Sequence, residues 1–391
     1  MIRLLPPIPS WSAAMIAAFV GFGGTIALVV QALRAMGASI DQAGSAVTAL
    51  CLAIAFAGAA LSFKFRMPVV LAWSTPGAAL LAAASSTFPW PVAIGVFCAA
   101  AVLMILVGVT PALGRLIDRI PPSIAAAMLA GVLLPFCLTL FRLGATDPLL
   151  IAALVVVFLA ARRRVPLYAL ILVLATAVGF TLLRGDMAEL APGRTFGALL
   201  PEQPRLDVRS IVSLALPLFM VTLVSQNLPG LVVLRSAGYE PPAGRLIAAT
   251  GVMSLVAAPF GAHGVNLAAI TAAICTGEDA HPDPARRWVV GVLYAGFYLA
   301  LAVFSPALVR LFLSLPPSII ASVTGLALIP ALLGAVEAMM VDKADRDPAI
   351  VTFLATASGL ALWGLGSAFW GLVAGFSALA IKYLCKDRRT A

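Results

Sequence analysis

The chain has 391 residues, of which 62% are hydrophobic and only 10% are charged, and its formal net charge is +9 at pH 7. So few charged residues cannot cover the water-facing surface of a chain this long, which excludes a soluble protein and indicates one that crosses a lipid bilayer many times. Because the basic residues are scattered in short loops between apolar runs, we expect no nucleic-acid partner.

Apolar segments that could enter a bilayer recur along the whole chain. In the first half they cover residues 11–33, 43–62, 67–85, 91–113, 121–141, 148–161 and 166–183. In the second half they cover residues 210–233, 243–258, 262–277, 288–313, 317–339, 348–364 and 367–384. The predicted fold is therefore an all-α polytopic membrane protein with 14 transmembrane segments, seven in each half.

The two halves share a repeated sequence. Residues 110–135 match residues 305–330 without gaps, at an offset of 195, with identity at 12 of 26 positions that include four prolines in each copy. An odd number of segments in each copy forces the copies into opposite orientations, which is the inverted repeat typical of secondary transporters. The predicted division is a first repeat over residues 1–184, a proline-rich linker over 185–209 and a second repeat over 210–391.

The positions of the basic residues provide an independent test of this topology. If both termini are cytoplasmic, 18 of the 25 Lys and Arg residues lie on the cytoplasmic side and 7 lie outside. This asymmetry agrees with the positive-inside rule. The sequence thus predicts a multi-pass membrane protein with both ends in the cytoplasm.

The third and tenth segments are interrupted by proline and glycine. Residues 66–77 contain Trp-Ser-Thr-Pro-Gly at positions 73–77, and residues 258–266 contain His263 and Asn266. Irregular backbone at membrane depth persists only where it is buried in protein or lines a cavity. We therefore expect the two breaks to face each other and to form a binding site. The competing interpretation is a pair of kinks that only lets the helices pack closely.

Helices that restart after the two breaks would direct their N-termini toward the same point. We expect one to begin at Thr75 or Pro76, with Thr75 as a good N-cap, and the other to begin near Asn266. Aligning Pro68 with Pro259 places Thr75 and Asn266 at equivalent positions. Each N-terminus offers about half a positive charge and free N–H groups. Together they predict an anion site that needs no buried cation.

Polar residues elsewhere in apolar segments are further candidates. Gln226 and Asn227 are adjacent in the eighth segment, where amides either contact the substrate or a gate, or bond to neighbouring helices. His263 is the only residue at predicted mid-membrane depth whose charge changes near neutral pH, so it is a candidate proton carrier; the alternative is a neutral histidine used for packing. The run Gly-Phe-Gly-Gly at residues 21–24 indicates close helix packing.

Chemistry other than transport has little support in the sequence. We find no pair of carboxylates suited to acid–base hydrolysis, no cluster of metal ligands and no P-loop. We therefore expect neither an enzyme nor an ATP-driven pump, and we expect no metal and no cofactor.

The chain resembles the benzoate/proton symporter family of bacterial inner membranes. The resemblance extends over essentially the whole chain and is carried by residues 72–78, 225–230, 234–239, 266–275, 281–287 and 366–371. More distantly, the chain is similar to uracil/xanthine permeases and related anion exchangers. That similarity implies short strands and half-helices in segments 3 and 10, a core domain from segments 1–4 and 8–11, a gate domain from segments 5–7 and 12–14, and often a homodimer.

One departure from the permeases bears on the substrate. Nucleobase carriers place glutamates in the eighth and tenth segments, and the resemblance puts Gln226 and His263 at those positions. A carboxylate substrate tolerates neutral groups there, whereas a second carboxylate would repel it. The resemblance and the residues thus agree on an aromatic or small organic anion.

The predicted function is proton-coupled symport of benzoate or a similar aromatic carboxylate by alternating access in the bacterial inner membrane. The expected partners are lipid, the substrate and a proton, and a homodimer is a possible assembly. Break residues hold the carboxylate, aromatic residues hold the ring, amides give directional hydrogen bonds and His263 carries the proton. The break residues are Ser74, Thr75, Gly77 and Asn266, the aromatic residues are Trp73 and Phe22, and the amides are Gln226 and Asn227. A carrier or exchanger of another anion or of a nucleobase, a channel, and a membrane-embedded enzyme stay open as alternatives.

Overall fold

The computed structural model describes residues 6–84, 89–111, 121–363 and 365–387. Within these residues, eight helical stretches are long and apolar enough to cross a membrane. They are Ile8–Ala35, Ile40–Phe65, Trp90–Val109, Pro122–Leu143, Val208–Ser236, Ala243–Phe260, Pro284–Leu313 and Pro317–Met340. The prediction of a helical polytopic membrane protein is therefore confirmed, and the count of 14 segments stays a prediction.

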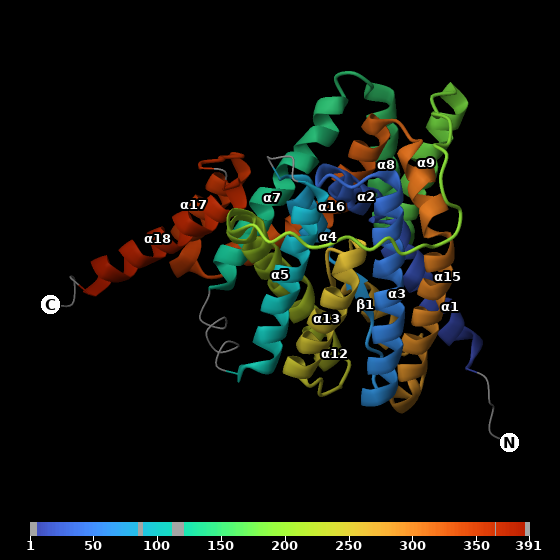
Figure 1. Cartoon of the computed structure of the whole chain (residues 1–391), viewed down its shortest axis with the longest axis horizontal. Helices are drawn as coiled ribbons and strands as arrows, with labels where there is room; N and C mark the ends of the chain where they lie inside the picture. Colours follow the sequence, from blue (N-terminus) through green and yellow to red (C-terminus); the bar gives the residue numbers. More distant parts are fainter. Residues whose placement is uncertain (1–5, 85–88, 112–120, 364, 388–391) are drawn as a thin grey trace.

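The first half contains one strand among its helices (Figure 1). Its elements are α1 (Ile8–Gly23), α2 (Ile26–Ala35), α3 (Ile40–Phe65), β1 (Leu71–Trp73), α4 (Thr75–Ala82), α5 (Trp90–Val109), α7 (Pro122–Leu143), α8 (Pro148–Arg164), η1 (Pro166–Tyr168) and α9 (Ala169–Arg184).

The second half has the same general order, with π-helical and 3₁₀ turns inserted. Its first elements are α10 (Val208–Ser210), η2 (Ile211–Ala215), α11 (Leu216–Thr222), η3 (Leu223–Asn227), α12 (Leu228–Ser236), α13 (Ala243–Ala257), η4 (Ala258–Phe260), β2 (Val265–Leu267) and α14 (Ile270–Thr276). The chain then forms η5 (Pro284–Arg286), α15 (Trp288–Leu313), α16 (Pro317–Met340), η6 (Lys343–Asp345), α17 (Arg346–Ala357) and α18 (Ser367–Asp387).

Two pairs of equivalent helices in the two halves begin 195 residues apart. This spacing separates the first residues of α7 and α16, Pro122 and Pro317, and also those of α4 and α14, Thr75 and Ile270. Both α7 and α16 start at the second proline of a pair, where the missing N–H costs nothing. The alignment of Pro68 with Pro259 is therefore wrong by four residues, because it equates Thr75 with Asn266. Residues 112–120 of the repeated sequence lie outside the described residues.

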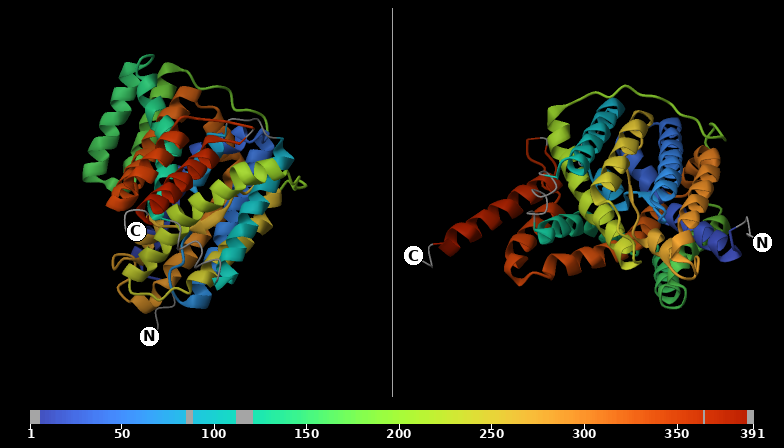
Figure 2. Two further views of the ribbon diagram at one scale, coloured as in Figure 1. Left: turned by 90° about the vertical axis from the view of Figure 1, so that its left-hand side faces the viewer. Right: turned by 90° about the horizontal axis from the view of Figure 1, so that it is seen from below.

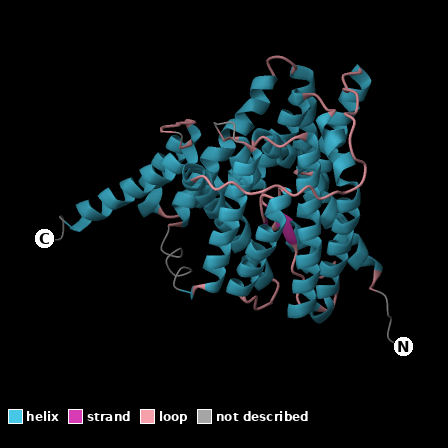
Figure 3. Cartoon of the chain, in the orientation of Figure 1, coloured by secondary structure: helices cyan, strands magenta, loops and turns pink. Residues whose placement is uncertain are grey.

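The most extensive helix contacts join the two halves of the chain. Helix α3 packs along α15, α5 packs along α13, and α7 packs along α16. In contrast, α18 extends away from the main bundle (Figure 1), whereas α17 packs against both α18 and α7. The N-terminal helices and the two short strands lie within this bundle, with the strands enclosed by helices (Figure 3).

The segment 185–209 has no helix before Val208, yet it is fixed to the bundle. Arg310 Nη1 donates to the Ala191 carbonyl at 3.0 Å, and the Leu200 N–H donates to Ser45 Oγ at 2.8 Å. The segment runs across the ends of several helices (Figure 2). Hydrogen bonds to α3 and α15 therefore hold this connection against the first and second halves at once.

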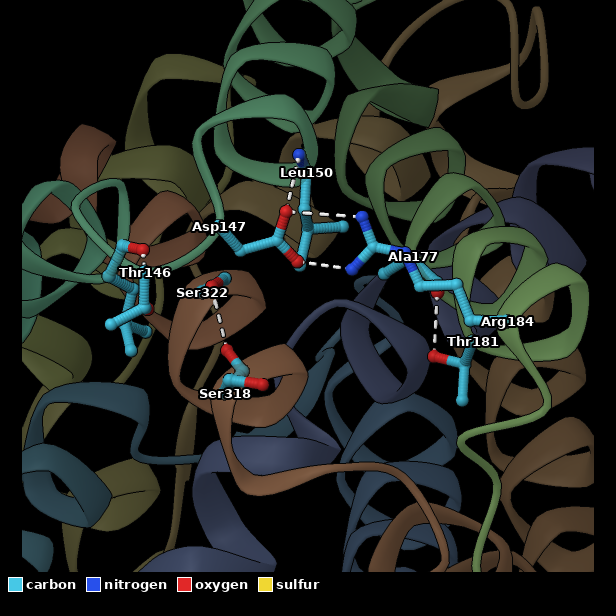
Figure 4. Close-up of polar contacts among 9 residues, drawn as sticks. Thr146, Asp147, Leu150, Ala177, Thr181, Arg184, Ser318 and Ser322 are labelled. Carbon is cyan, nitrogen blue, oxygen red and sulfur yellow. Dashed lines mark hydrogen bonds and ion pairs between the residues drawn. The ribbon is translucent and has the colours of Figure 1, made fainter.

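An ion pair joins the ends of two helices at the periphery (Figure 4). Asp147 accepts from the Leu150 N–H at 3.1 Å as the N-cap of α8, and it receives two hydrogen bonds from Arg184, the last residue of α9. A carboxylate at a helix N-terminus and a cation at a C-terminus each complement the helix dipole. The pair thus fixes α8 against α9.

We expect the contribution of this ion pair to disappear in acid. The hydrogen bond from Arg184 lowers the pKa of Asp147 below its ordinary value of 3.8. A lowered folded-state pKa contributes stability above the unfolded value and loses it as the pH falls through the folded value. Asp147→Asn should lower the thermal unfolding temperature slightly at pH 7, since the pair is partly exposed. The difference from wild type should shrink below pH 3.8; a difference that is constant with pH would contradict this origin.

Candidate functional site

The two broken segments meet as a short antiparallel ribbon. In its register Leu71 pairs with Leu267, Ala72 with Asn266, and Trp73 with Val265. Because successive side chains point to opposite faces of a strand, Asn266 and Trp73 lie on opposite faces of the ribbon.

The first turn of α4 is capped by Ser74, and Thr75 is the first helical residue, so the expected cap at Thr75 is wrong by one position. Ser74 continues the extended backbone of β1, with φ −85° and ψ 106°, and its Oγ accepts from the Gly77 N–H at 2.9 Å. The Ser74 carbonyl accepts from the Ala78 N–H at 2.8 Å, and Pro76 has no N–H. Only the Thr75 N–H in this turn is left for a ligand.

The start of α14 offers more free donors. The helix begins at Ile270, whereas Asn266 lies in β2, so the expected start near Asn266 is wrong by four residues. No side chain caps this end. Within the described residues, the N–H groups of Ile270, Thr271 and Ala272 have no hydrogen-bond partner, and neither has the buried Thr271 hydroxyl.

Asn227 ties the eighth segment to β2. Its Nδ2 donates to Asn266 Oδ1 at 2.9 Å, and its Oδ1 accepts from the Leu267 N–H at 3.0 Å. Asn227 closes the π-helical turn η3 and is fully buried, and the π turn shifts the side chain toward the strand. Asn227 therefore makes the hydrogen bonds to a neighbouring segment that the sequence offered as the alternative to contact with substrate or gate. The neighbouring Gln226 is half-buried and makes no side-chain hydrogen bond within the described part of the chain.

His263 links the start of β2 with the cap of α4. Its Nε2 lies 3.4 Å from the Ser74 carbonyl oxygen, and its ring packs edge-on against Phe97 with centroids 6.4 Å apart. The imidazole is 3% exposed, and Nδ1 has no partner among the described residues. Asn266 lies three residues further along the same break, and its Nδ2 is likewise buried without a partner among the described residues.

Gly261 permits the turn that leads to His263. Its φ is 98°, and a Cβ at this position would lie 2.7 Å from both Ala46 Cβ and Trp90 Cζ2. Gly261→Ala should therefore destabilise the fold by about 1–2 kcal/mol from backbone strain alone, with the clash added to it. Thermal unfolding in detergent tests this, with Gly296→Ala in α15 as the control because a Cβ there meets no atom within 4 Å. Equal unfolding temperatures for the two variants would contradict it.

Trp73 lies in an aromatic cluster on the other face of the ribbon. Its ring packs edge-on against Phe22 and Tyr298, with centroids 5.4 and 6.2 Å apart. Its Nε1 donates to the Thr25 hydroxyl, at the gap between α1 and α2, over 2.8 Å. The pairing of Phe22 with Trp73 agrees with an aromatic wall. Sequence reasoning missed Thr25 and Tyr298, although a threonine directly after Gly-Gly and a tyrosine within an apolar helix are both visible signals.

The predicted residues thus form three pairs. Ser74 meets His263, Asn227 meets Asn266, and Phe22 meets Trp73. Within the described residues, no hydrogen bond joins one pair to another, and no group of three or more His, Cys, Asp or Glu side chains could hold a metal. These contacts leave the substrate role of each residue as a prediction.

A cavity of about 290 Å³ lies apart from these pairs. It is bounded by the C-terminal end of α4 at Leu80, by α7 at Phe136, by η2 at Leu214 and by the end of α17 at Thr356. None of the predicted site residues lines it. The cavity lies at the C-terminal end of α4, whereas Ser74 and the ribbon lie at the N-terminal end, so the length of this helix separates the two.

Comparison with known proteins places the fold and the family. The chain superposes on the transmembrane domain of a cyanobacterium bicarbonate transporter, BicA, with a TM-score of 0.59 at 13% identity, covering 95% of this chain and 98% of that one. It superposes on the murine Solute Carrier 26 family member A9 anion transporter in the inward-facing state with a TM-score of 0.65 at 13% identity, covering 98% of this chain and 69% of that one. These similarities show a shared fold.

Sequence relatives are much closer. The chain is 39% identical over 386 residues to the inner membrane protein YdcO of Escherichia coli, with 98% of each chain covered. It is 36% identical over 371 residues to the benzoate membrane transport protein of Acinetobacter baylyi, with 94% of each chain covered. Residues 7–381 also match the family model described as benzoate membrane transport protein, and the chain therefore belongs to that family of multi-pass membrane transport proteins.

Proposed function

We propose that the protein is a secondary transporter that carries benzoate or a similar aromatic carboxylate together with a proton across the bacterial inner membrane by alternating access. The observation that carries the proposal is the set of unpartnered polar groups around the strand ribbon. Nδ1 of His263, Nδ2 of Asn266 and the Thr271 hydroxyl are buried without a hydrogen-bond partner in the described residues. Because such groups are costly in a protein interior, we infer that substrate and proton supply the missing partners.

The chemistry of these groups suits a carboxylate. Free N–H groups at the start of α14 and the Asn266 amide are donors, and donors to an ionised acceptor form the stronger hydrogen bonds. Gln226 and His263 add no fixed negative charge that would repel an anion. Phe22 and Trp73 supply an apolar wall for an aromatic ring.

The geometry of His263 supports a role in proton coupling. If Nε2 donates to the Ser74 carbonyl, Nδ1 carries the lone pair in the neutral ring. A proton that binds Nδ1 creates a cation whose charge favours a bound anion nearby, and release of the anion favours release of the proton. The two ligands would then bind and leave together.

The proposed architecture is the 14-segment inverted repeat, with segments 1–4 and 8–11 as a core that moves against a gate of segments 5–7 and 12–14, both termini in the cytoplasm, and two chains in a dimer. The spacing of 195 residues between the starts of α7 and α16, and between those of α4 and α14, supports the repeat. The helix contacts support it too. In the repeat α3 corresponds to α13 and α5 corresponds to α15, so a two-fold relation between the halves converts the contact of α3 with α15 into that of α13 with α5, and both contacts are present.

Direct binding to the purified protein tests the proposed substrate. We expect benzoate to raise the thermal unfolding temperature and to bind more tightly at pH 6 than at pH 8, since protonation and anion binding favour each other. Uracil and sulfate should compete weakly. Stronger competition by uracil or sulfate than by unlabelled benzoate would contradict an aromatic carboxylate as the substrate.

A further inference from the structure

Three helices converge on a pair of buried hydroxyls. A Cβ added to Gly21 in α1 would lie 3.2 Å from the hydroxyl oxygen of Tyr298 in α15 and 3.1 Å from Cγ2 of Thr271 in α14. Tyr298 is 0% exposed and Thr271 is 6% exposed. The glycine at position 21 is therefore what lets α1 approach these two side chains so closely.

The one polar neighbour that these hydroxyls share is a third hydroxyl, that of Tyr294. The Tyr294 hydroxyl lies near both and donates to the Leu71 carbonyl at 2.9 Å. The hydroxyls of Tyr298 and Thr271, however, make no well-aligned hydrogen bond within the described residues. Two unsatisfied hydroxyls side by side in a protein interior point to a partner that arrives from outside the chain.

The surroundings of the pair match an aromatic ligand that enters along α1. Tyr298 packs on Trp73, and Trp73 packs on Phe22, the residue after Gly21. A Cβ added to Gly23 would meet no atom within 4 Å, so open space exists one residue beyond Phe22. Ile270, directly before Thr271, is 70% exposed. An apolar wall and two hydroxyl groups thus lie together beside Trp73.

We propose that Tyr298 and Thr271 bind the carboxylate of the aromatic acid, each donating its hydroxyl hydrogen to a carboxylate oxygen, while Phe22 and Trp73 contact the ring. This inference rests on the proposed function, and it places the anion on the face of Trp73. Asn227 then serves to hold the ribbon in place, through its hydrogen bonds to Asn266 and to the Leu267 N–H.

The two tyrosines give a matched pair of variants. Tyr298→Phe removes a hydroxyl that makes no well-aligned hydrogen bond within the described residues, so it should leave thermal stability nearly unchanged. It should weaken benzoate binding about tenfold or more, since a hydrogen bond to a charged group is lost. Tyr294→Phe should do the reverse. It lowers thermal stability because the buried Leu71 carbonyl loses its donor, and it changes the Kd for benzoate less than about threefold.

Isothermal titration of benzoate and thermal unfolding, both on purified full-length protein, measure these effects. Thr271→Val should weaken binding as Tyr298→Phe does, and Thr271→Ser should restore it because the hydroxyl returns. Wild-type affinity in both Tyr298→Phe and Thr271→Val overturns this inference and leaves the proposed function standing. A wild-type protein that binds no aromatic acid overturns both. Should Tyr298→Phe fail to fold, the comparison of Thr271→Val with Thr271→Ser decides.

Discussion

Replacing His263 by glutamine is expected to separate exchange from proton-driven transport. Glutamine keeps a hydrogen-bonding side chain near the Ser74 carbonyl but cannot take up a proton. Proteoliposomes with His263→Gln should still exchange labelled for unlabelled benzoate, because substrate-loaded protein can change conformation without net proton movement. Net uptake driven by an inward proton gradient should fall to the level of protein-free liposomes.

The second histidine provides the control for this variant. His281 lies in the turn before α15, where its Nδ1 accepts from the Asp283 N–H at 3.0 Å. His281→Gln should keep both exchange and net uptake. If His263→Gln retained wild-type net uptake under the gradient, His263 would not be the proton carrier, and transport of the aromatic acid would need another coupling group.

Replacing Asn227 by leucine is expected to cause the largest loss of stability. The change leaves the Leu267 N–H and Asn266 Oδ1 buried without their partners. Each orphaned group costs about 1–3 kcal/mol, so the free energy of unfolding should fall by about 2–5 kcal/mol. The ribbon would also lose its attachment to η3, and transport should be abolished.

Gln226→Leu is the control for stability, because the side chain next to Asn227 is half-buried and makes no hydrogen bond within the described residues. Thermal unfolding in the same detergent should leave Gln226→Leu close to wild type and Asn227→Leu far below it. Similar unfolding temperatures for the two variants would show that the hydrogen bonds of Asn227 do not hold the ribbon.

Much of the fold follows from local signals in the sequence. Apolar segments of sufficient length predict the long helices, and the paired prolines before α7 and α16 predict where those helices begin. The breaks in segments 3 and 10 are predicted as well, because proline and glycine beside polar residues are incompatible with a continuous helix in hydrocarbon. What these signals give is the position of the site along the chain.

The contacts within the site are set by tertiary structure, which the sequence shows less directly. The cap falls on Ser74 because β1 delivers it in an extended conformation, and that strand exists only through pairing with β2. The pairing also puts Trp73 and Asn266 on opposite faces, which no property of either break alone reveals. Likewise, the π turn that brings Asn227 onto β2 has no clear signature in the residues of η3.

The most direct test of the central claim is the initial rate of labelled benzoate uptake by proteoliposomes of the wild-type protein, with and without an inward proton gradient. Neutral benzoic acid crosses bilayers unaided, so the rate in protein-free liposomes under the same gradient must be subtracted. A proton-coupled carrier predicts a protein-dependent rate that rises with the gradient, saturates with benzoate and is lost with a protonophore. A protein-dependent rate that ignores the gradient, or none above the protein-free background, would contradict the account.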